Sequence, residues 1–238
     1  MAEPLFPCPD GWKAITLEPN ARAGYILKVE TGGTPVTSIE EYWDGEIPWL
    51  TPKEITGLPS GSLVSHTERT ITEAGLRGSG AKLLAPGSVL LTKRAPVGIV
   101  VVNTVPMTTN QGFLNFVCGP NLRPQFLAYW FEGNRKYLDL IANGSTYPEL
   151  YKGDLNEFII AIPSLEIQDR IIAVLNAFQF FVELGGPLKY TSADLASVHR
   201  ISQSNSMLLA MRNELLPLLL SGSIDLSRIN INKEGSSI

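Results

Sequence analysis

Short apolar runs alternate with glycine and proline through residues 12–162 of the chain. Many of the apolar residues are β-branched or aromatic. Such residues favour strands, and glycine and proline favour the turns between them. The predicted strands are residues 12–17, 25–30, 81–84, 89–92, 98–103 and 158–162, with a turn at Pro86-Gly87. Two helices are also predicted in this region. Residues 71–76 follow a capping-box spacing with Thr70 as N-cap, and residues 123–142 carry apolar side chains at helical spacing.

The hydrophobic pattern changes to a heptad-like pattern after residue 164. Residues 165–184 place apolar side chains at alternating spacings of four and three, which predicts a helix with one apolar seam and Ser164 as N-cap. The seam residues are Ile167, Ile171, Val174, Phe178 and Phe181.

A second seam helix is predicted after the break at Gly185-Gly186-Pro187. It runs from residue 191 to about residue 221 and stops at Gly222. Its seam residues are Val198, Ile201, Asn205, Leu208, Met211, Leu215 and Leu218. A polar Asn205 in this seam is typical of helices whose register and partner number are fixed. The two seams either pack on their own domain or form the interface with a second copy and a partner protein.

These patterns predict an α+β protein with two structured regions. Residues 1–164 form a globular domain with a twisted β-sheet and flanking helices, and residues 165–222 form a long, coiled-coil-like helical spacer. Residues 223–238 are a polar tail.

Charge is distributed unevenly along the chain. The protein has 238 residues and a net charge of −4, but residues 74–131 contain no acid and five bases. Residues 31–73 carry seven acids against two bases. Because the local field steers a polyanion, the acid-free stretch is predicted to face nucleic acid. The equally weighted alternative is a basic patch on an ordinary fold.

Several classes of protein are disfavoured by what the sequence lacks. The two cysteines and two histidines form no metal-binding pattern, and no phosphate-binding or hydrolase motif is present. No signal peptide or membrane-spanning run is found, so a cytoplasmic protein that contacts no membrane is expected. The sequence predicts a protein with no catalytic residues, no metal and no cofactor of its own.

Three sequence blocks, in order, resemble the specificity (S) subunits of Type I restriction–modification systems. The first is GGTP at 32–35 with YWDGEIPWLTPKEI at 42–55. The second is AKLLAPGSVLL at 81–91 with RAPVG at 94–98 and TNQGF at 109–113. The third is GSTYPEL at 144–150 with IPSLEIQ at 162–168. Together the blocks extend over nearly the whole chain.

The resemblance implies a non-catalytic DNA-recognition subunit. Such subunits read a bipartite site on double-stranded DNA and recruit a methyltransferase (M) subunit and a nuclease-translocase (R) subunit; S-adenosylmethionine is then expected only in the M subunit. This sequence has one recognition domain and one helical region where the family usually has two. It is therefore expected to form a homodimer that reads an inverted repeat.

Two other functions remain open at this point. The chain could be a truncated specificity fragment that modulates the methyltransferase subunit without reading DNA. It could also be an enzyme, although the sequence shows no catalytic constellation that would support this.

The candidate DNA-binding residues are basic or amide-bearing side chains near strand ends. Arginine and lysine suit phosphates and guanine, and asparagine and glutamine suit adenine. The candidates are Thr51, Lys53, Arg69, Arg77, Lys82, Lys93, Arg94, Asn110, Gln111 and Thr146. For Asn110 and Gln111 the favoured alternative is a role in holding the shared framework. For Thr51 and Lys53 a simple turn is an equally weighted alternative to a phosphate contact. The dimer or partner interface is predicted at Ile167, Ile171, Val174, Phe178, Phe181, Ile201, Asn205, Leu208 and Leu215.

Overall fold

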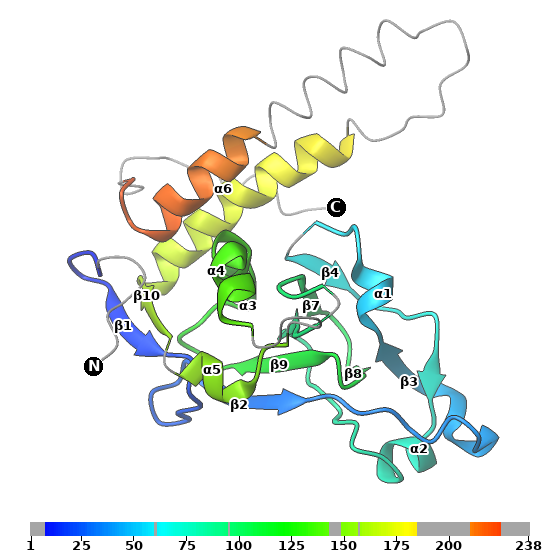
Figure 1. Ribbon diagram of the computed structural model, residues 1–238. Coiled ribbons are helices and arrows are strands. Elements are labelled where there is room, and N and C mark those ends of the chain that lie inside the picture. Colours follow the sequence, from blue (N-terminus) through cyan, green and yellow to red (C-terminus); the bar gives the residue numbers. More distant parts are fainter. Residues whose placement is uncertain are drawn as a thin grey trace, which may run out of the picture.

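The fold is a mixed α/β domain with helices packed on one side of its largest sheet (Figure 1). The computed structural model describes residues 8–59, 61–94, 96–142, 149–156, 158–184 and 210–224, with side chains of the 158–184 segment described up to residue 177. The strands are β1 (Lys13–Thr16), β2 (Ile26–Thr31), β3 (Trp43–Leu50), β4 (Ser62–Val64), β5 (Thr70–Ile71), β6 (Ser88–Thr92), β7 (Val100–Asn103), β8 (Thr108–Thr109), β9 (Phe113–Cys118) and β10 (Ile159–Ile162). The helices are η1 (Glu40–Tyr42), α1 (Pro52–Ile55), α2 (Glu73–Arg77), α3 (Pro124–Gly133), α4 (Arg135–Ile141), α5 (Lys152–Asn156) and α6 (Leu165–Leu184).

The largest sheet has five strands in the order β2-β9-β6-β7-β4. Its pairs are antiparallel except β4–β7, which is parallel. Successive residues of a strand point to opposite faces. Val89 and Leu91 therefore join one hydrophobic core, while Leu90 joins a second core with Ile55 and Phe113 on the other face. Burial on both faces explains the continuous apolar runs in β6 and β7, which read as strands in the sequence.

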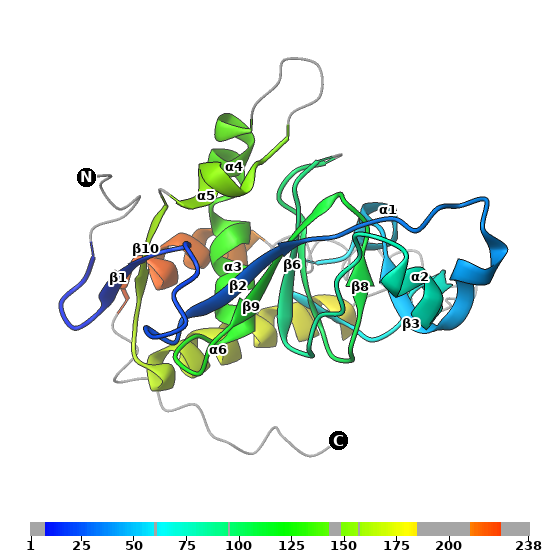
Figure 2. The same cartoon turned by 90° about the horizontal axis from the view of Figure 1, so that it is seen from below.

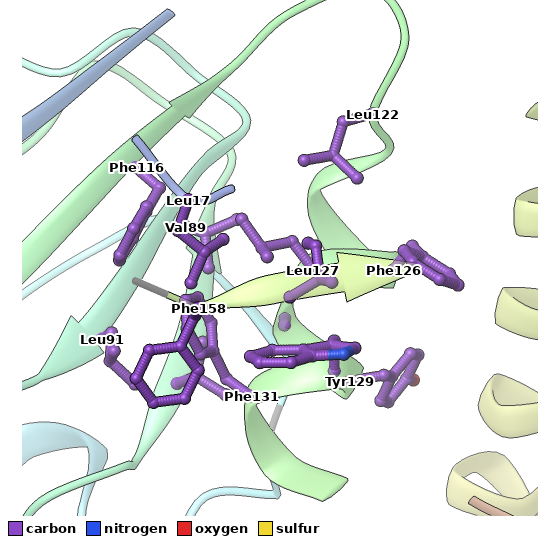
Figure 3. Close-up of a cluster of buried hydrophobic side chains, with 14 of the residues drawn as sticks. Leu17, Val89, Leu91, Phe116, Leu122, Phe126, Leu127, Tyr129, Phe131 and Phe158 are labelled. Carbon is purple, nitrogen blue, oxygen red and sulfur yellow. The ribbon is translucent and has the colours of Figure 1, made fainter. Parts of the chain in front are cut away.

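The larger core lies between this sheet and α3. Figure 3 shows Val89, Leu91 and Phe116 of the sheet close to Leu127 and Phe131 of α3. Phe126 and Tyr129 extend from the other side of α3, toward α6. All these side chains are at most 1% exposed, and burial of a large apolar side chain contributes about 2–3 kcal/mol. Helix α3 is thus the shared support of the sheet and of the C-terminal helices.

Most of the predicted strands are confirmed, and three local predictions are wrong. Residues 81–84 form no strand, because only Leu84 bridges to Met107. Residues 123–142 form two helices that meet at Asn134, whose side chain donates to the Trp130 carbonyl instead of continuing the helix. The N-cap of α2 is Thr72, which accepts from the Gly75 amide at 3.1 Å, because Thr70 is a strand residue paired with β3.

The predicted helix at residues 165–184 is confirmed as α6, and it packs against its own domain. Ile171 is 1% exposed within the larger core, and Ile167 and Val174 are partly buried against the same core. The first half of this seam therefore packs against the hydrophobic core of its own domain. The side chains of Phe178 and Phe181 lie outside the described residues.

A helical segment at residues 210–220 returns to α3 and ends at Gly222 as predicted, with φ +68°. Its buried apolar residues are Leu216, Leu219 and Leu220, while Leu215 is partly buried. Met211 and Leu218 of the predicted seam are each 44% exposed, so the face turned to α3 is offset from that seam. Ile201, Asn205 and Leu208 lie outside the described residues, and the coiled-coil spacer remains a prediction.

A buried ion pair fixes this returning helix. The Arg212 side chain is 5% exposed and donates to both carboxylate oxygens of Glu132 on α3. The guanidinium carbon also lies 5.7 Å from the ring centroid of Tyr129. A Cβ on Gly133 would lie 2.8 Å from Leu220 Cδ1, so the helices approach closely at this glycine.

The buried amide of Gln168 joins α6 to two other segments. Its Oε1 accepts from the Arg123 amide at 2.8 Å, and its Nε2 donates to the carbonyls of Asn121 and Pro163. Above it, Arg123 forms two hydrogen bonds with Asp169, and that carboxylate raises the pKa of the arginine. Gln168, which is 0% exposed, therefore pairs with three backbone groups.

We expect Gln168→Ala to lower the free energy of unfolding by about 2–3 kcal/mol, because it leaves buried backbone groups unpaired. Urea denaturation followed by circular dichroism measures this change. The matched control is Gln125→Ala on α3, a partly exposed residue, which should change stability by less than about 0.5 kcal/mol. Equal effects of the two substitutions would contradict the role assigned to Gln168.

Burial raises the pKa of the Cys118 thiol to about 12, whereas Cys8 is exposed. The thiolate is the reactive form, so folded protein at pH 8 should react with a thiol reagent rapidly at one cysteine only. In denaturant, Cys118 should react with the reagent as well. Because the folded-state pKa is raised, stability should also fall as pH rises above the unfolded value of about 8.5. Two rapidly reacting thiols in the native protein would contradict this assignment.

Candidate nucleic-acid interface

A small three-stranded sheet forms the end of the molecule farthest from β1 and β10 (Figures 1 and 2). Its order is β5-β3-β8, with β3 antiparallel to β5 and parallel to β8. We call this sheet together with α2 and residues 32–36 the β3 module. Its hydrophobic core comprises Trp43, Ile47, Trp49, Ile71 and Ala81.

Residues 32–36 hold the two tryptophans of this core. The Trp49 indole donates to the Gly33 carbonyl at 2.9 Å, and the Trp43 indole donates to the Val36 carbonyl at 3.3 Å. The two rings meet edge to face, with centroids 5.1 Å apart. Both rings are thus fixed by hydrogen bonds as well as by packing.

Two glycines allow this segment to contact two backbones at once. A Cβ on Gly32 would lie 2.0 Å from the Asn110 carbonyl oxygen, and one on Gly33 would lie 2.4 Å from the Ala81 amide nitrogen. The Gly33 amide also donates to the Thr109 carbonyl at 2.9 Å. No larger residue fits at either position, which gives the first sequence block a physical reason.

The structure places Asn110 and Gln111 in roles that hold the framework. Asn110 Oδ1 accepts from the Gly112 backbone amide at 2.8 Å. The backbone amide of Asn110 donates to the Leu50 carbonyl. Gln111 Oε1 accepts from the Thr34 hydroxyl, although its side chain is exposed. These contacts favour the framework alternative for both residues, and a DNA contact remains a prediction.

Thr51 and Lys53 lie where β3 passes into α1. The Thr51 amide and hydroxyl both donate to Glu54 Oε2, at 2.8 and 2.7 Å, which caps the short helix. Lys53 is exposed on α1. Thr51 is therefore part of a structured turn, while the Lys53 ammonium remains available to a ligand.

Acids from other segments neutralise most bases of the acid-free stretch. The Lys93 ammonium lies 2.6 Å from Glu149, and Arg94 lies 3.8 Å from the same carboxylate. Arg77 pairs with Glu73 at 3.7 Å. With the Arg123–Asp169 pair, four of the five bases in residues 74–131 have an acidic partner. These ion pairs reduce the positive charge of the stretch, and the predicted contact of this stretch with nucleic acid remains a prediction.

Three candidate cations remain without an ion pair among the described residues: Lys53, Arg69 and Lys82. All three are exposed. Arg69 adjoins β5, and Lys82 follows the core residue Ala81, so both are next to residues of the β3 module. Thr146 lies outside the described residues.

Arg69 differs from the other two because its side chain is stacked. The guanidinium carbon lies 3.6 Å from the Trp43 ring centroid and 5.7 Å from that of Trp49. Trp43 is 7% exposed, and its support of Arg69 was not predicted from the sequence. Glu149 was likewise not anticipated. No local signal marks either contact, because each joins residues far apart in sequence.

The chemistry available in this region is hydrogen-bond donation and positive charge. Among the described residues no group of three or more His, Cys, Asp or Glu side chains could hold a metal ion. The helices within the described ranges include none long and apolar enough to cross a membrane. The arrangement can bind an anion or a base edge.

Comparison with known proteins gives a consistent family. The family described as Type I restriction modification DNA specificity domain matches residues 20–185. The MjaIX specificity subunit of Methanocaldococcus jannaschii is 40% identical over 160 residues, covering 66% of this chain and 37% of that protein. The EcoR124I/EcoR124II specificity subunit of Escherichia coli is 29% identical over 163 residues, covering 65% and 39%. The alignments thus span well under half the length of these curated relatives.

Solved structures show the same fold. A chain from work on complex assembly and conformational transition of the type I R-M system gives a TM-score of 0.56 at 22% identity, covering 92% of this chain and 50% of that one. The HsdS subunit from Thermoanaerobacter tengcongensis gives 0.55 at 20% identity, covering 91% and 46%.

We expect Glu149→Gln to raise affinity for DNA of random sequence, because it frees Lys93 and Arg94 from their shared carboxylate. One or two additional phosphate contacts would steepen the dependence of log K on log salt concentration by about 0.9 each. Fluorescence anisotropy over a salt series measures this slope. Glu18→Gln, which removes an exposed acid that has no ion pair among the described residues, is the control for net charge. If both variants show the same slope as wild type, Lys93 and Arg94 do not meet DNA.

Proposed function

The chain belongs to the family of Type I restriction modification DNA specificity domains, and we propose that it is a non-catalytic subunit that reads DNA sequence. The observation that carries this proposal is the family match over residues 20–185, which includes the whole β3 module. The proposed role is to pair with a second copy, read a bipartite site, and bring a methyltransferase subunit to it.

The charge distribution supports DNA reading by a limited surface. Lys53, Arg69 and Lys82 supply exposed donors for phosphates or base edges. The net charge of −4 and the paired bases disfavour tight binding by the chain alone. We therefore propose weak, salt-dependent binding by the isolated protein, which tightens when the methyltransferase subunit adds its own contacts.

The proposed pairing joins two identical copies of the chain. Two identical readers related by a twofold axis read an inverted repeat. Helix α6 has 20 residues and is about 30 Å long, which is close to one turn of DNA.

The proposed partners supply the chemistry. Methyl transfer, and the S-adenosylmethionine that it consumes, would belong to the methyltransferase subunit, and DNA cleavage to a nuclease-translocase subunit. The curated relatives are named specificity subunits, which agrees with this division. Exposed Met211 and Leu218 remain available for such a partner or for a second copy.

A second candidate function is modulation of the methyltransferase subunit without DNA reading. It is favoured by one observation, the pairing of four of the five bases in residues 74–131 with three carboxylates. Sequence-selective retention of DNA separates the two functions.

We expect selection from a random duplex library at low salt to enrich a gapped inverted repeat. The selection should be performed with protein of known solution mass, with and without a methyltransferase subunit, because the second set of contacts raises affinity. Sequencing of the retained DNA reads out both half-sites and their spacing. A dimer that retains an inverted repeat is the expected result.

Two other results would change the assignment. Enrichment of a single half-site by a monomer would remove the pairing but keep the DNA-reading function. No enrichment even with the methyltransferase subunit, despite formation of the complex, would favour the modulator.

A further inference from the structure

We propose that Arg69, held against the ring of Trp43, is a specificity-determining residue that reads a guanine in the major groove. This inference rests on the proposed DNA-reading function. It goes beyond that function because it names one side chain and the base that it recognises.

The geometry leaves the edge of the guanidinium group available while its face is covered. Arg69 is exposed, its guanidinium carbon lies 3.6 Å from the Trp43 ring centroid, and no acid pairs with it among the described residues. Stacking fixes the plane of the group, and its N–H donors lie in that plane. A fixed planar fork suits a ligand with two acceptors side by side.

The backbone of Arg69 is also fixed. Its carbonyl accepts from the Trp49 amide at 3.1 Å and from the Thr67 hydroxyl at 2.6 Å. The following residue, Thr70, pairs with Pro48 of β3. A side chain anchored at both its backbone and its guanidinium loses little conformational entropy on binding, which favours specificity.

The charges near Arg69 favour a base edge over a phosphate. The preceding residue, Glu68, is exposed, and its amide donates to Glu54 Oε1 at 2.7 Å. Two carboxylates close along this turn would repel a phosphate, whereas a base edge is uncharged. Guanine presents O6 and N7 as adjacent acceptors in the major groove, and arginine binds both at once.

Trp43 acts through Arg69 as a positioning residue. It is 7% exposed, its indole donates to the Val36 carbonyl, and its ring lies nearly perpendicular to that of Trp49. The ring is therefore too buried to stack on a base, and its available face is occupied by the guanidinium. Removing the ring should free Arg69 without removing its charge.

The test replaces each guanine of the selected site in turn by 7-deazaguanine, which lacks the N7 acceptor, and measures affinity by fluorescence anisotropy. Wild-type protein should lose at least about fivefold in affinity at one guanine of each half-site. Arg69→Ala should bind the unmodified site about 5- to 150-fold more weakly and show no further loss at that guanine. If the affinity loss at that guanine disappears when Arg69 is replaced, Arg69 contacts the guanine directly.

Control variants separate reading from charge and from stability. Arg22→Ala removes an equally exposed arginine in the loop before β2 and should keep the 7-deazaguanine effect. Trp43→Phe, which retains an aromatic face, should keep it too, and Trp43→Leu should weaken it. Circular dichroism confirms that each variant is folded, and the phenylalanine variant keeps the test valid if the leucine variant unfolds.

Different results would contradict the role of Arg69 and the proposed DNA-reading function. If a site is selected but Arg69→Ala retains the full 7-deazaguanine loss at every guanine, Arg69 does not read a guanine. If the affinity loss in Arg69→Ala is equal for selected and random DNA, Arg69 contacts phosphate and the inference is wrong. If no site is selected with or without the methyltransferase subunit, the DNA-reading function itself fails.

Discussion

The contact of Gly32 and Gly33 with two other backbones is the constraint on which the candidate interface depends. At this point residues 32–36 touch the end of β8 and the start of the segment at Ala81, closer than any side chain would allow. The same residues accept the indole hydrogen bonds of Trp43 and Trp49. The tryptophans in turn support Arg69. A backbone contact thus determines where the Arg69 side chain lies. Substitution of either glycine would shift Arg69 indirectly, first through residues 32–36 and then through the two tryptophans.

The sequence predicts the elements of the fold better than their pairing. Apolar runs and the heptad pattern identify five of the ten described strands and α6, because a strand or helix face that enters a core must be apolar along its own length. The pattern did not single out β9, although this strand is central in the large sheet. Asn115 interrupts its apolar run, and it is tolerated inside because it donates to Thr109. The seam of the returning helix was also offset, since Arg212 replaces an apolar residue on its buried face.

Candidate site residues are harder to judge from sequence because their roles depend on distant partners. Asn110, a plausible adenine reader by type, is held by the Gly112 amide. Lys93 and Arg94 look available within an acid-free stretch, yet both lie near the carboxylate of Glu149 from the third block, which offsets one of their two charges. Arg69, by contrast, lies in an acidic stretch and keeps its charge free. Resemblance to a family locates the domain, and the structure shows which of its cations have an acidic partner.

The pairing of β1 with β10 has a consequence for how the protein is made. Lys13 pairs with Ile162, so β1 cannot form its sheet until β10 has been synthesised. At ribosomal rates this delay is on the order of ten seconds. Contacts between residues so far apart in sequence also slow folding in the complete chain. During synthesis the N-terminal segment therefore stays unpaired and accessible to chaperones, and the domain closes only as the base of α6 leaves the ribosome.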